Sequence, residues 1–377
     1  MNHIRWDPCI SHRDDAARSF IKAFFADEKR HPLLICGAGF DPRATETAKL
    51  LHAAAGARLA AHFIREDRPN PSSELLARAN GNEECLGNLI TRHTLHHVPI
   101  FSDDEKTVVA GRRIVEILRK TDLNDVTDII IDLSALSIGV SFPLIRYLFG
   151  CAESQSEFPN LHIMVSTSIQ MDEAIQTQLM DRYQNVPGFG EDLGLANTAR
   201  KPKLWLPQLA KRAVPALDLI HRAFDFEEIC PIVPFPAHGC RAVEELVEIY
   251  QGQITETWDV DDRDFLYAAE DDPLDLYRTI LRIDTLRQAT YAIEECSQTV
   301  LSPLGTKAMA LGALLAALER DLPIIYVEAQ RYMMIQEPAT KPYGLIHLWL
   351  TGEVYPKPHI APAPLGASAC PTSSEPV

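Results

Sequence analysis

The chain has 377 residues, 46% of them hydrophobic, and a formal net charge of −16 at pH 7. This length accommodates two domains of ordinary size or one large one, and the apolar content is sufficient for a full hydrophobic core. The negative charge argues against a broad nucleic-acid surface or an anionic-membrane surface, although it leaves room for one local basic pocket.

The cysteines and the first residues of the chain bear on the cellular compartment in which the protein is expected. Eight cysteines are scattered without a C-x-x-C pair, and several lie inside apolar runs, as buried free thiols do. The opening residues lack the apolar stretch of a signal peptide, and no run approaches the length of a membrane span. We therefore expect a soluble, cytoplasmic protein that does not bind membranes.

The first half of the chain alternates between apolar runs and helical patterns. Continuous apolar runs predict buried strands at residues 32–40, 57–64, 127–136 and 160–168. Helical spacing is found at residues 42–55, 106–120 and 140–150. Buried strands that are separated by helices are typical of a parallel sheet covered on both faces.

A second series of elements follows a polar stretch at residues 191–203, which reads as a linker. Strands are expected at 204–209, 228–237, 323–329 and 344–350, and helices at 241–252, 271–293 and from 307 onward. The prediction is an α/β protein with two Rossmann-like lobes, residues 1–200 and 201–354, whose sheets are mainly parallel. Residues 355–377 are rich in Pro, Ala and Ser and are predicted to be disordered.

The first candidate ligand-binding segment is CGAGFDPRATETAKLL, where a helix follows a buried strand. Gly37 and Gly39 let the backbone turn tightly, and the free N–H groups of the helix start attract an anion. Arg43 opposes the helix dipole, so it needs an anionic partner, either a ligand phosphate or Glu46. Asp41 fits equally well as an ordinary helix cap, and both interpretations remain open.

The same segment is an incomplete dinucleotide fingerprint, because Pro42 stands where the third glycine belongs. Glu66 and Asp67 follow the next strand, where such folds place a ribose-binding acid. The surrounding IREDRPNP equally suits a solvated loop, which is the interpretation that ordinary exposed charges favour. NAD is therefore not the expected cofactor.

The second candidate ligand-binding segment is TVLSPLGTKAMALGALL, which links an apolar strand to an Ala/Leu-rich helix. Ser302 supplies a hydroxyl, Gly305 allows close backbone approach, and Thr306 can cap the helix. Lys307 is a point charge that suits a phosphate. The segment lacks the residue order of a P-loop, so ATP hydrolysis of that kind is not expected. A plain turn with a solvated lysine is the alternative.

The strand followed by LSPLGTKAMALGALLAAL resembles the Gly-Thr-Lys turn of CARF domains, the CRISPR-associated Rossmann-fold sensors. In that family the turn helps to hold the phosphates of a cyclic oligoadenylate. The likeness spans one strand, turn and helix, and Pro303 and Leu304 replace the paired glycines. It implies that Thr306 and Lys307 contact a nucleotide or cyclic oligonucleotide, and that the protein serves antiviral defence.

Two carboxylates are candidates for a catalytic role. Asp132 ends an apolar strand and is followed by Ser134 and Ser137, and the carboxyl ends of strands are where α/β proteins bind ligands. Asp and Ser are also ordinary turn residues. Asp41 is the other candidate, because it follows the first apolar strand in the same way.

Histidines and cysteines do not predict a metal site. His93, His96 and His97 lie close in sequence without a carboxylate or cysteine at convincing spacing. His238 and Cys240 could form a nucleophilic pair, but no third orienting residue is identifiable, so this role is not predicted.

We expect a protein that binds a small phosphate-bearing ligand, with a nucleotide favoured, and that acts as a sensor or accessory component in bacterial defence or signalling. A protein partner is compatible with such a role. Two alternatives remain open: a nucleotide-processing enzyme, either a hydrolase or a glycosyl-transferring enzyme, and a protein-interaction scaffold.

Overall fold

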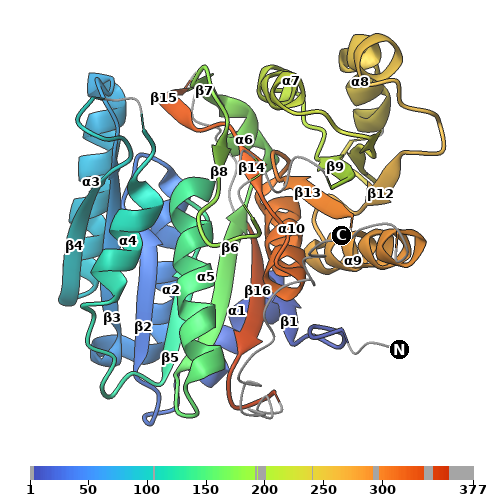
Figure 1. The fold of residues 1–377 in the computed structure, drawn as a ribbon. Helices are drawn as coiled ribbons and strands as arrows, with labels where there is room; N and C mark the ends of the chain where they lie inside the picture. Colours follow the sequence, from blue (N-terminus) through green and yellow to red (C-terminus); the bar gives the residue numbers. More distant parts are fainter. Residues whose placement is uncertain are drawn as a thin grey trace, which may run out of the picture.

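The computed structural model describes residues 4–104, 107–191, 193, 201–239, 241–291, 297–334 and 343–355. A seven-stranded sheet forms the larger part of the molecule (Figure 1). From one edge to the other its strands are β4 (Arg92–Pro99), β3 (Ala60–Asp67), β2 (Pro32–Gly37), β5 (Asp128–Asp132), β6 (Asn160–Thr167), β16 (Gly344–Thr351) and β1 (Ser11–Arg13). The first five are mutually parallel, β16 pairs antiparallel with β6, and β1 pairs antiparallel with β16.

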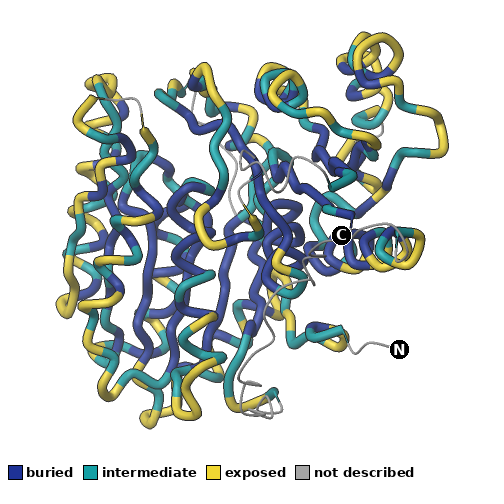
Figure 2. The backbone as a smooth tube through the Cα atoms, in the orientation of Figure 1, coloured by how far each residue is buried: buried dark blue, intermediate teal, exposed yellow. Residues whose placement is uncertain are grey.

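Helices cover both faces of this sheet, as the continuous apolar strands require. Helices α1 (Asp14–Phe24), α2 (Glu46–Ala55) and α3 (Ser73–Leu89) pack on one face, and α4 (Ala110–Leu118) and α5 (Ile138–Ser154) pack on the other. Along β2 the side chains alternate between the two cores: Leu34 and Cys36 point to the first face, whereas Ile35 points to the second. Figure 2 shows the central strands buried and the outer sides of the helices exposed.

The smaller part contains a second parallel sheet. Its strands are β10 (Glu228–Ile229), β9 (Lys203–Pro207) and β13 (Gln298–Ser302), with a separate parallel pair formed by β11 (Ile232–Pro234) and β12 (Leu266–Ala268). Its helices are α7 (Val214–Ala223), α8 (Ala242–Ile249), α9 (Pro273–Thr290) and α10 (Lys307–Arg320). The chain is thus a mixed α/β protein with Rossmann-like, mainly parallel sheets and flanking helices, which confirms the predicted fold class.

One predicted strand pairs only partly as expected, because its parallel contact is a single bridge between Ile324 and Leu301 of β13. The run at residues 323–329 was expected in a parallel sheet, but β14 (Ile325–Tyr326) pairs antiparallel with β8 (Gln184–Asn185). The neighbouring β15 (Ala329–Met334) pairs antiparallel with β7 (Ile175–Leu179). The run is apolar because it lies buried where the two parts of the molecule meet, and burial alone does not determine strand direction.

Strand β16 was expected in the second lobe, but it lies beside β6 in the seven-stranded sheet. The pairing therefore crosses the predicted division into residues 1–200 and 201–354. Most of the predicted linker, and residues 356–377 of the predicted disordered tail, lie outside the described residues.

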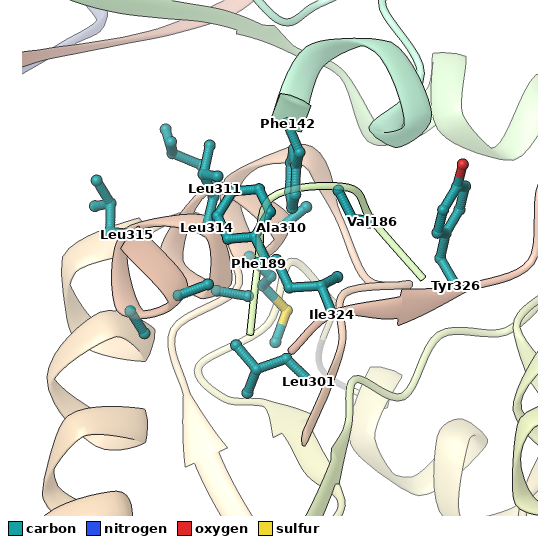
Figure 3. Packing of buried hydrophobic residues seen from close by; sticks show 14 of the residues in the cluster. Phe142, Val186, Phe189, Leu301, Ala310, Leu311, Leu314, Leu315, Ile324 and Tyr326 are labelled. Carbon is teal, nitrogen blue, oxygen red and sulfur yellow. The ribbon is translucent and has the colours of Figure 1, made fainter. Parts of the chain in front are cut away.

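One apolar core extends through both parts of the molecule. Figure 3 shows Leu311 and Leu314 of α10 near Phe142 of α5, and both Leu301 of β13 and Phe189 belong to the same cluster. Because the core is continuous, the two sheets support each other and are expected to unfold together. No helix in the described parts of the chain has the length and apolar character needed to cross a membrane.

A row of three histidines crosses the edge strands of the large sheet; His162 and His347 are buried, and His12 is partly buried. Asp128 accepts a hydrogen bond from Nε2 of His162 (3.3 Å), whose Nδ1 lies 3.0 Å from Nε2 of His347. Nδ1 of His347 lies 2.9 Å from Nδ1 of His12. A carboxylate can only accept, so Nε2 of His162 must carry a proton and its Nδ1 must accept. In neutral rings, His347 then donates from Nε2 to His162 and accepts at Nδ1 from Nδ1 of His12. Arg30 also contacts Asp128 (3.4 Å).

Burial lowers the pKa of His162 and His12 below 6.5, and it lowers the pKa of His347 well below this value, with further lowering of the latter by the two neighbouring rings. The unfolded chain therefore takes up protons near pH 6.5 while the folded chain does not. We expect the free energy of unfolding to fall as the pH drops below about 6.5, by about 1.4 kcal/mol per pH unit for each histidine that stays neutral.

Urea unfolding of the wild type and of His347→Gln between pH 7.5 and 5 measures this slope. The variant should have a shallower slope, because the unfolded state then binds one proton fewer. His31→Gln, at an exposed position, serves as the control for altering a surface histidine. An unchanged slope in His347→Gln would show that a lowered pKa of His347 does not contribute to the pH dependence of stability.

Candidate functional site

A cleft of about 1060 Å³ opens where the carboxyl ends of the strands from both parallel sheets meet. The segments after β2, β3 and β5 line one side, and the segments after β9 and β13 line the other. The chain passes from β2 outward to β3 and β4 and then returns to the opposite side of β2 as β5. The cleft therefore lies at the point where the strand order reverses, which is the usual ligand position in open α/β sheets.

The structure brings the two predicted ligand-binding segments to the same cleft. Six of the predicted residues line it, and three do not. The lining residues are Gly39, Asp41, Arg43, Gly305, Thr306 and Lys307, whereas Gly37, Ser302 and Asp132 lie behind the surface.

Gly37 has a packing role at the strand reversal. A Cβ atom at this position would lie 2.8 Å from the carbonyl oxygen of Ala135. Glycine is thus required where the loops after β2 and β5 approach each other. Ser302 is also buried, and its hydroxyl accepts a hydrogen bond from Nε1 of Trp205 (2.9 Å).

Arg43 finds its anionic partners within the protein. Its Nη2 lies 2.7 Å from Oδ2 of Asp41, and its Nη1 lies 2.8 Å from Oδ1 of Asp172. The guanidinium is almost completely buried, and both carboxylates raise its pKa against the effect of burial. Glu46, the partner suggested by sequence, pairs with Lys49 instead (3.2 Å). Arg43 therefore holds the cleft wall together, with its charge already compensated.

Asp41 also caps the helical turn that it precedes, which was one of the two interpretations left open by the sequence. Its Oδ1 accepts the backbone N–H of Arg43 (2.9 Å), at the start of the 3-10 turn η1 (Pro42–Thr45) that leads into α2. The capping and ion-pairing roles occupy both carboxylate oxygens.

Lys307 is the first residue of α10, and Thr306 is the N-cap, as predicted. The Thr306 hydroxyl accepts from the backbone N–H of Met309 (3.3 Å) and donates to the carbonyl of Glu270 (2.9 Å). The Lys307 ammonium donates to the carbonyl of Leu136 (2.5 Å), which lies in the loop after β5. Lys307 thereby bridges the two parts of the molecule across the base of the cleft.

The charge of Lys307 is not neutralised by a direct ion pair with any residue that the structure describes. Burial lowers its pKa, and Arg43 lowers it further, whereas Asp172, Glu66 and Asp41 act in the opposite direction. An anionic ligand beside this partly buried ammonium would favour its charged form.

Gly305 is required by close packing in the turn. Its N–H donates to Oε1 of Gln208 (3.1 Å), and a Cβ atom at this position would lie 2.8 Å from the same oxygen. Any larger residue would displace Gln208 from the turn.

Asp132 is buried beneath the cleft. Its Oδ1 accepts from the backbone N–H of Ser134 (2.8 Å) and also from the Ser134 hydroxyl. Burial raises the pKa of Asp132 to about 6, against the lowering effect of the Ser134 hydrogen bonds. Ser134 and Ser137 do line the cleft. Catalytic roles for Asp41 and Asp132 stay predictions.

Arg68 was not identified from the sequence; it follows β3 and holds together the cleft wall beside the loop after β5. Arg68 contacts Glu66 (3.1 Å) and Glu328 (2.9 Å) and also donates to the carbonyl of Ala329. Glu66 in turn accepts the backbone N–H of Ser137 (2.7 Å) at the start of α5. The solvated-loop interpretation is wrong for Glu66 and Arg68, because both side chains are largely buried. Their sequence neighbourhood is charged and proline-rich, so no local pattern indicated this burial.

The histidines of residues 93–97, for which no metal site was predicted, make separate contacts. On β4, His96 bonds to His62 (2.7 Å), and His97 pairs with Asp67 (3.1 Å). His93 bonds to the carbonyl of Ile90. Cys240, the cysteine considered as a partner of His238, lies outside the described residues.

Comparison with known proteins yields little. No family model matches the chain, and no curated protein matches it. A Pseudomonas aeruginosa protein described as a universal stress protein is similar to it with a TM-score of 0.23 and 10% identity, over 80% of this chain and 94% of that chain. Similarity at this level supports no conclusion about function.

The cleft differs in charge from the rest of the molecule. Its lining contains eight acidic and eight basic side chains, whereas the chain as a whole has 52 acidic and 36 basic residues. An anionic ligand therefore meets less repulsion in the cleft than the net charge of the whole chain would imply.

Proposed function

We propose that the protein binds a nucleotide, or another small phosphate-bearing ligand, in this cleft. The observation that carries the proposal is the position of the Lys307 ammonium. It lies at the N-terminus of α10 and is bonded to Leu136, two residues before α5 begins.

The surroundings of Lys307 favour an anion for two reasons. Helix N-termini present N–H groups and the positive end of the helix dipole, and two helices begin next to this ammonium. A lysine in the first turn of a helix is also unfavourable without an anion, and Asp172, Glu66 and Asp41 offset this cost without a direct ion pair to Lys307. The resemblance of this turn to that of CARF domains supports a cyclic oligonucleotide as one form of the ligand, and a role as a sensor or accessory component in bacterial defence or signalling.

The two alternatives have less support. A nucleotide-processing enzyme would use Asp41 or Asp132, but Arg43 holds the first and the second is buried beneath the cleft. An interaction scaffold would not require a lysine at the base of a cleft.

Lys307→Met tests the proposal directly, because methionine retains much of the apolar stem and removes the charge. We expect ligand affinity to fall by about 1–3 kcal/mol, the range for a hydrogen bond to a charged group. Thermal shift and calorimetry with mononucleotides, dinucleotides and cyclic oligoadenylates measure the loss, since a ligand that prefers the folded state raises its stability. Lys49→Met, on the exposed side of α2, is the matched control.

Thr306→Ala separates folding from binding. Loss of this cap should destabilise the protein by about 1 kcal/mol whether or not a ligand is present. If Lys307→Met and Lys49→Met respond identically to every compound, the loop is only a turn and the proposal is wrong.

A further inference from the structure

The cleft has an apolar end that the phosphate-binding proposal does not explain. Phe40 follows β2, Pro69 and Pro71 follow β3, Leu76 lies in the first turns of α3, and Tyr332 belongs to β15. Leu76 is 44% exposed, which is high for a large apolar side chain in the wall of a cleft. Apolar side chains gathered in this way within a cleft mark a surface for a ligand.

The aromatic rings at this end are held in place before any ligand arrives. The rings of Phe40 and Tyr332 lie 5.4 Å apart, and the guanidinium of Arg68 lies 4.8 Å from the centre of the Tyr332 ring. The backbone around Phe40 is fixed by Asn82 of α3, whose amide donates to the carbonyls of Gly39 (2.7 Å) and Asp41 (3.0 Å). Preorganised rings lose little entropy when a flat ligand packs against them.

A continuous set of contacts joins the apolar end to the lysine. Tyr332 contacts Arg68, and Arg68 pairs with Glu66. Glu66 accepts a hydrogen bond from the backbone N–H of Ser137. The carbonyl of the preceding residue, Leu136, accepts a hydrogen bond from the Lys307 ammonium. Both ends of this wall line the same cleft, so a ligand that occupies both would have to combine a flat apolar group with a phosphate.

We infer that Phe40, Leu76 and Tyr332 form a base-binding subsite and that the ligand is a nucleoside phosphate whose base packs against Phe40. This inference rests on the proposed function, because it takes Lys307 as the phosphate contact. It adds that sugar phosphates and inorganic phosphates are not the preferred ligands.

The test compares compounds that contain one or both parts of such a ligand. AMP, ATP and cyclic tetra-adenylate carry base and phosphate; ribose 5-phosphate and pyrophosphate carry phosphate alone; adenosine carries the base alone. Calorimetry with the full chain should show the tightest binding for a member of the first group. Phe40→Ala should weaken that binding about 5- to 150-fold, the effect of removing one aromatic ring that stacks on a base, and should leave pyrophosphate binding unchanged.

Three further variants keep the result interpretable. Phe40→Trp retains a stacking surface and should retain binding. Phe40→Leu replaces Phe40→Ala if the latter does not fold, and it should also weaken binding. Leu286→Ser alters an apolar residue on α9 that is 60% exposed and does not line the cleft, so binding should be unaffected.

The outcomes distinguish this inference from the proposed function. If ribose 5-phosphate binds as tightly as the nucleotides and Phe40→Ala changes nothing, the base subsite is wrong and the phosphate site stands. If adenosine binds in a Phe40-dependent way and Lys307→Met has no effect on any compound, the base subsite stands and the phosphate site is wrong. If none of the compounds binds to the wild type, both are wrong.

Discussion

Replacing Trp6 with alanine should lower the free energy of unfolding by about 3–5 kcal/mol, as is usual for a large aromatic side chain removed from a core. Trp6 is fully buried, and its Nε1 donates to the carbonyl of Leu350 in β16 (2.8 Å). Its ring lies 5.7 Å from Phe149 of α5 and 5.7 Å from Tyr277 of α9. The residue thus joins the large sheet to the smaller part of the molecule.

Urea unfolding at neutral pH measures the loss, and a single transition is expected because both parts share the core around Trp6. Trp6→Phe should cost less, since it retains aromatic packing and loses only the indole hydrogen bond and part of the volume. Phe235→Ala, at a position that is 59% exposed, should change stability by no more than about 0.5 kcal/mol. A loss in Trp6→Ala no larger than in this control would contradict the role of Trp6.

Replacing Arg68 with methionine should also destabilise the protein by about 3–5 kcal/mol, the cost of breaking a buried ion pair from one side. The substitution leaves Glu66 and Glu328 without their common cation, and it removes a donor to the carbonyl of Ala329. It also removes the group that packs on Tyr332, so nucleotide binding should weaken together with stability.

A double variant tests whether uncompensated carboxylates cause the loss of stability in Arg68→Met. Arg68→Met combined with Glu328→Gln should recover part of the lost stability, because one uncompensated charge is removed. Arg78→Met, in an exposed pair with Glu74 on α3, should change stability by less than about 1 kcal/mol. Equal effects of Arg68→Met and Arg78→Met would show that the buried cluster is not important for folding.

Local sequence was sufficient for the elements whose signals lie within a few residues. The apolar runs that became β2, β5 and β6 predicted buried parallel strands, because a strand covered on both faces needs apolar residues at every position. Asp41 and Thr306 were candidate helix caps from their types and positions, since a cap bonds to N–H groups only two or three residues away.

The strand order and the composition of the cleft were determined only by the tertiary structure. The pairing of β16 with β6, the ion pair between Arg43 and Asp172 and the contact between Lys307 and Leu136 all join segments that are distant along the chain. Periodicity reports whether a side chain is buried, but it contains no information about which distant residue it meets. Residue type and local pattern thus determined the strands, helix caps and candidate loops of this protein, whereas long-range packing decided that those loops share one cleft and that most of its charges are already paired.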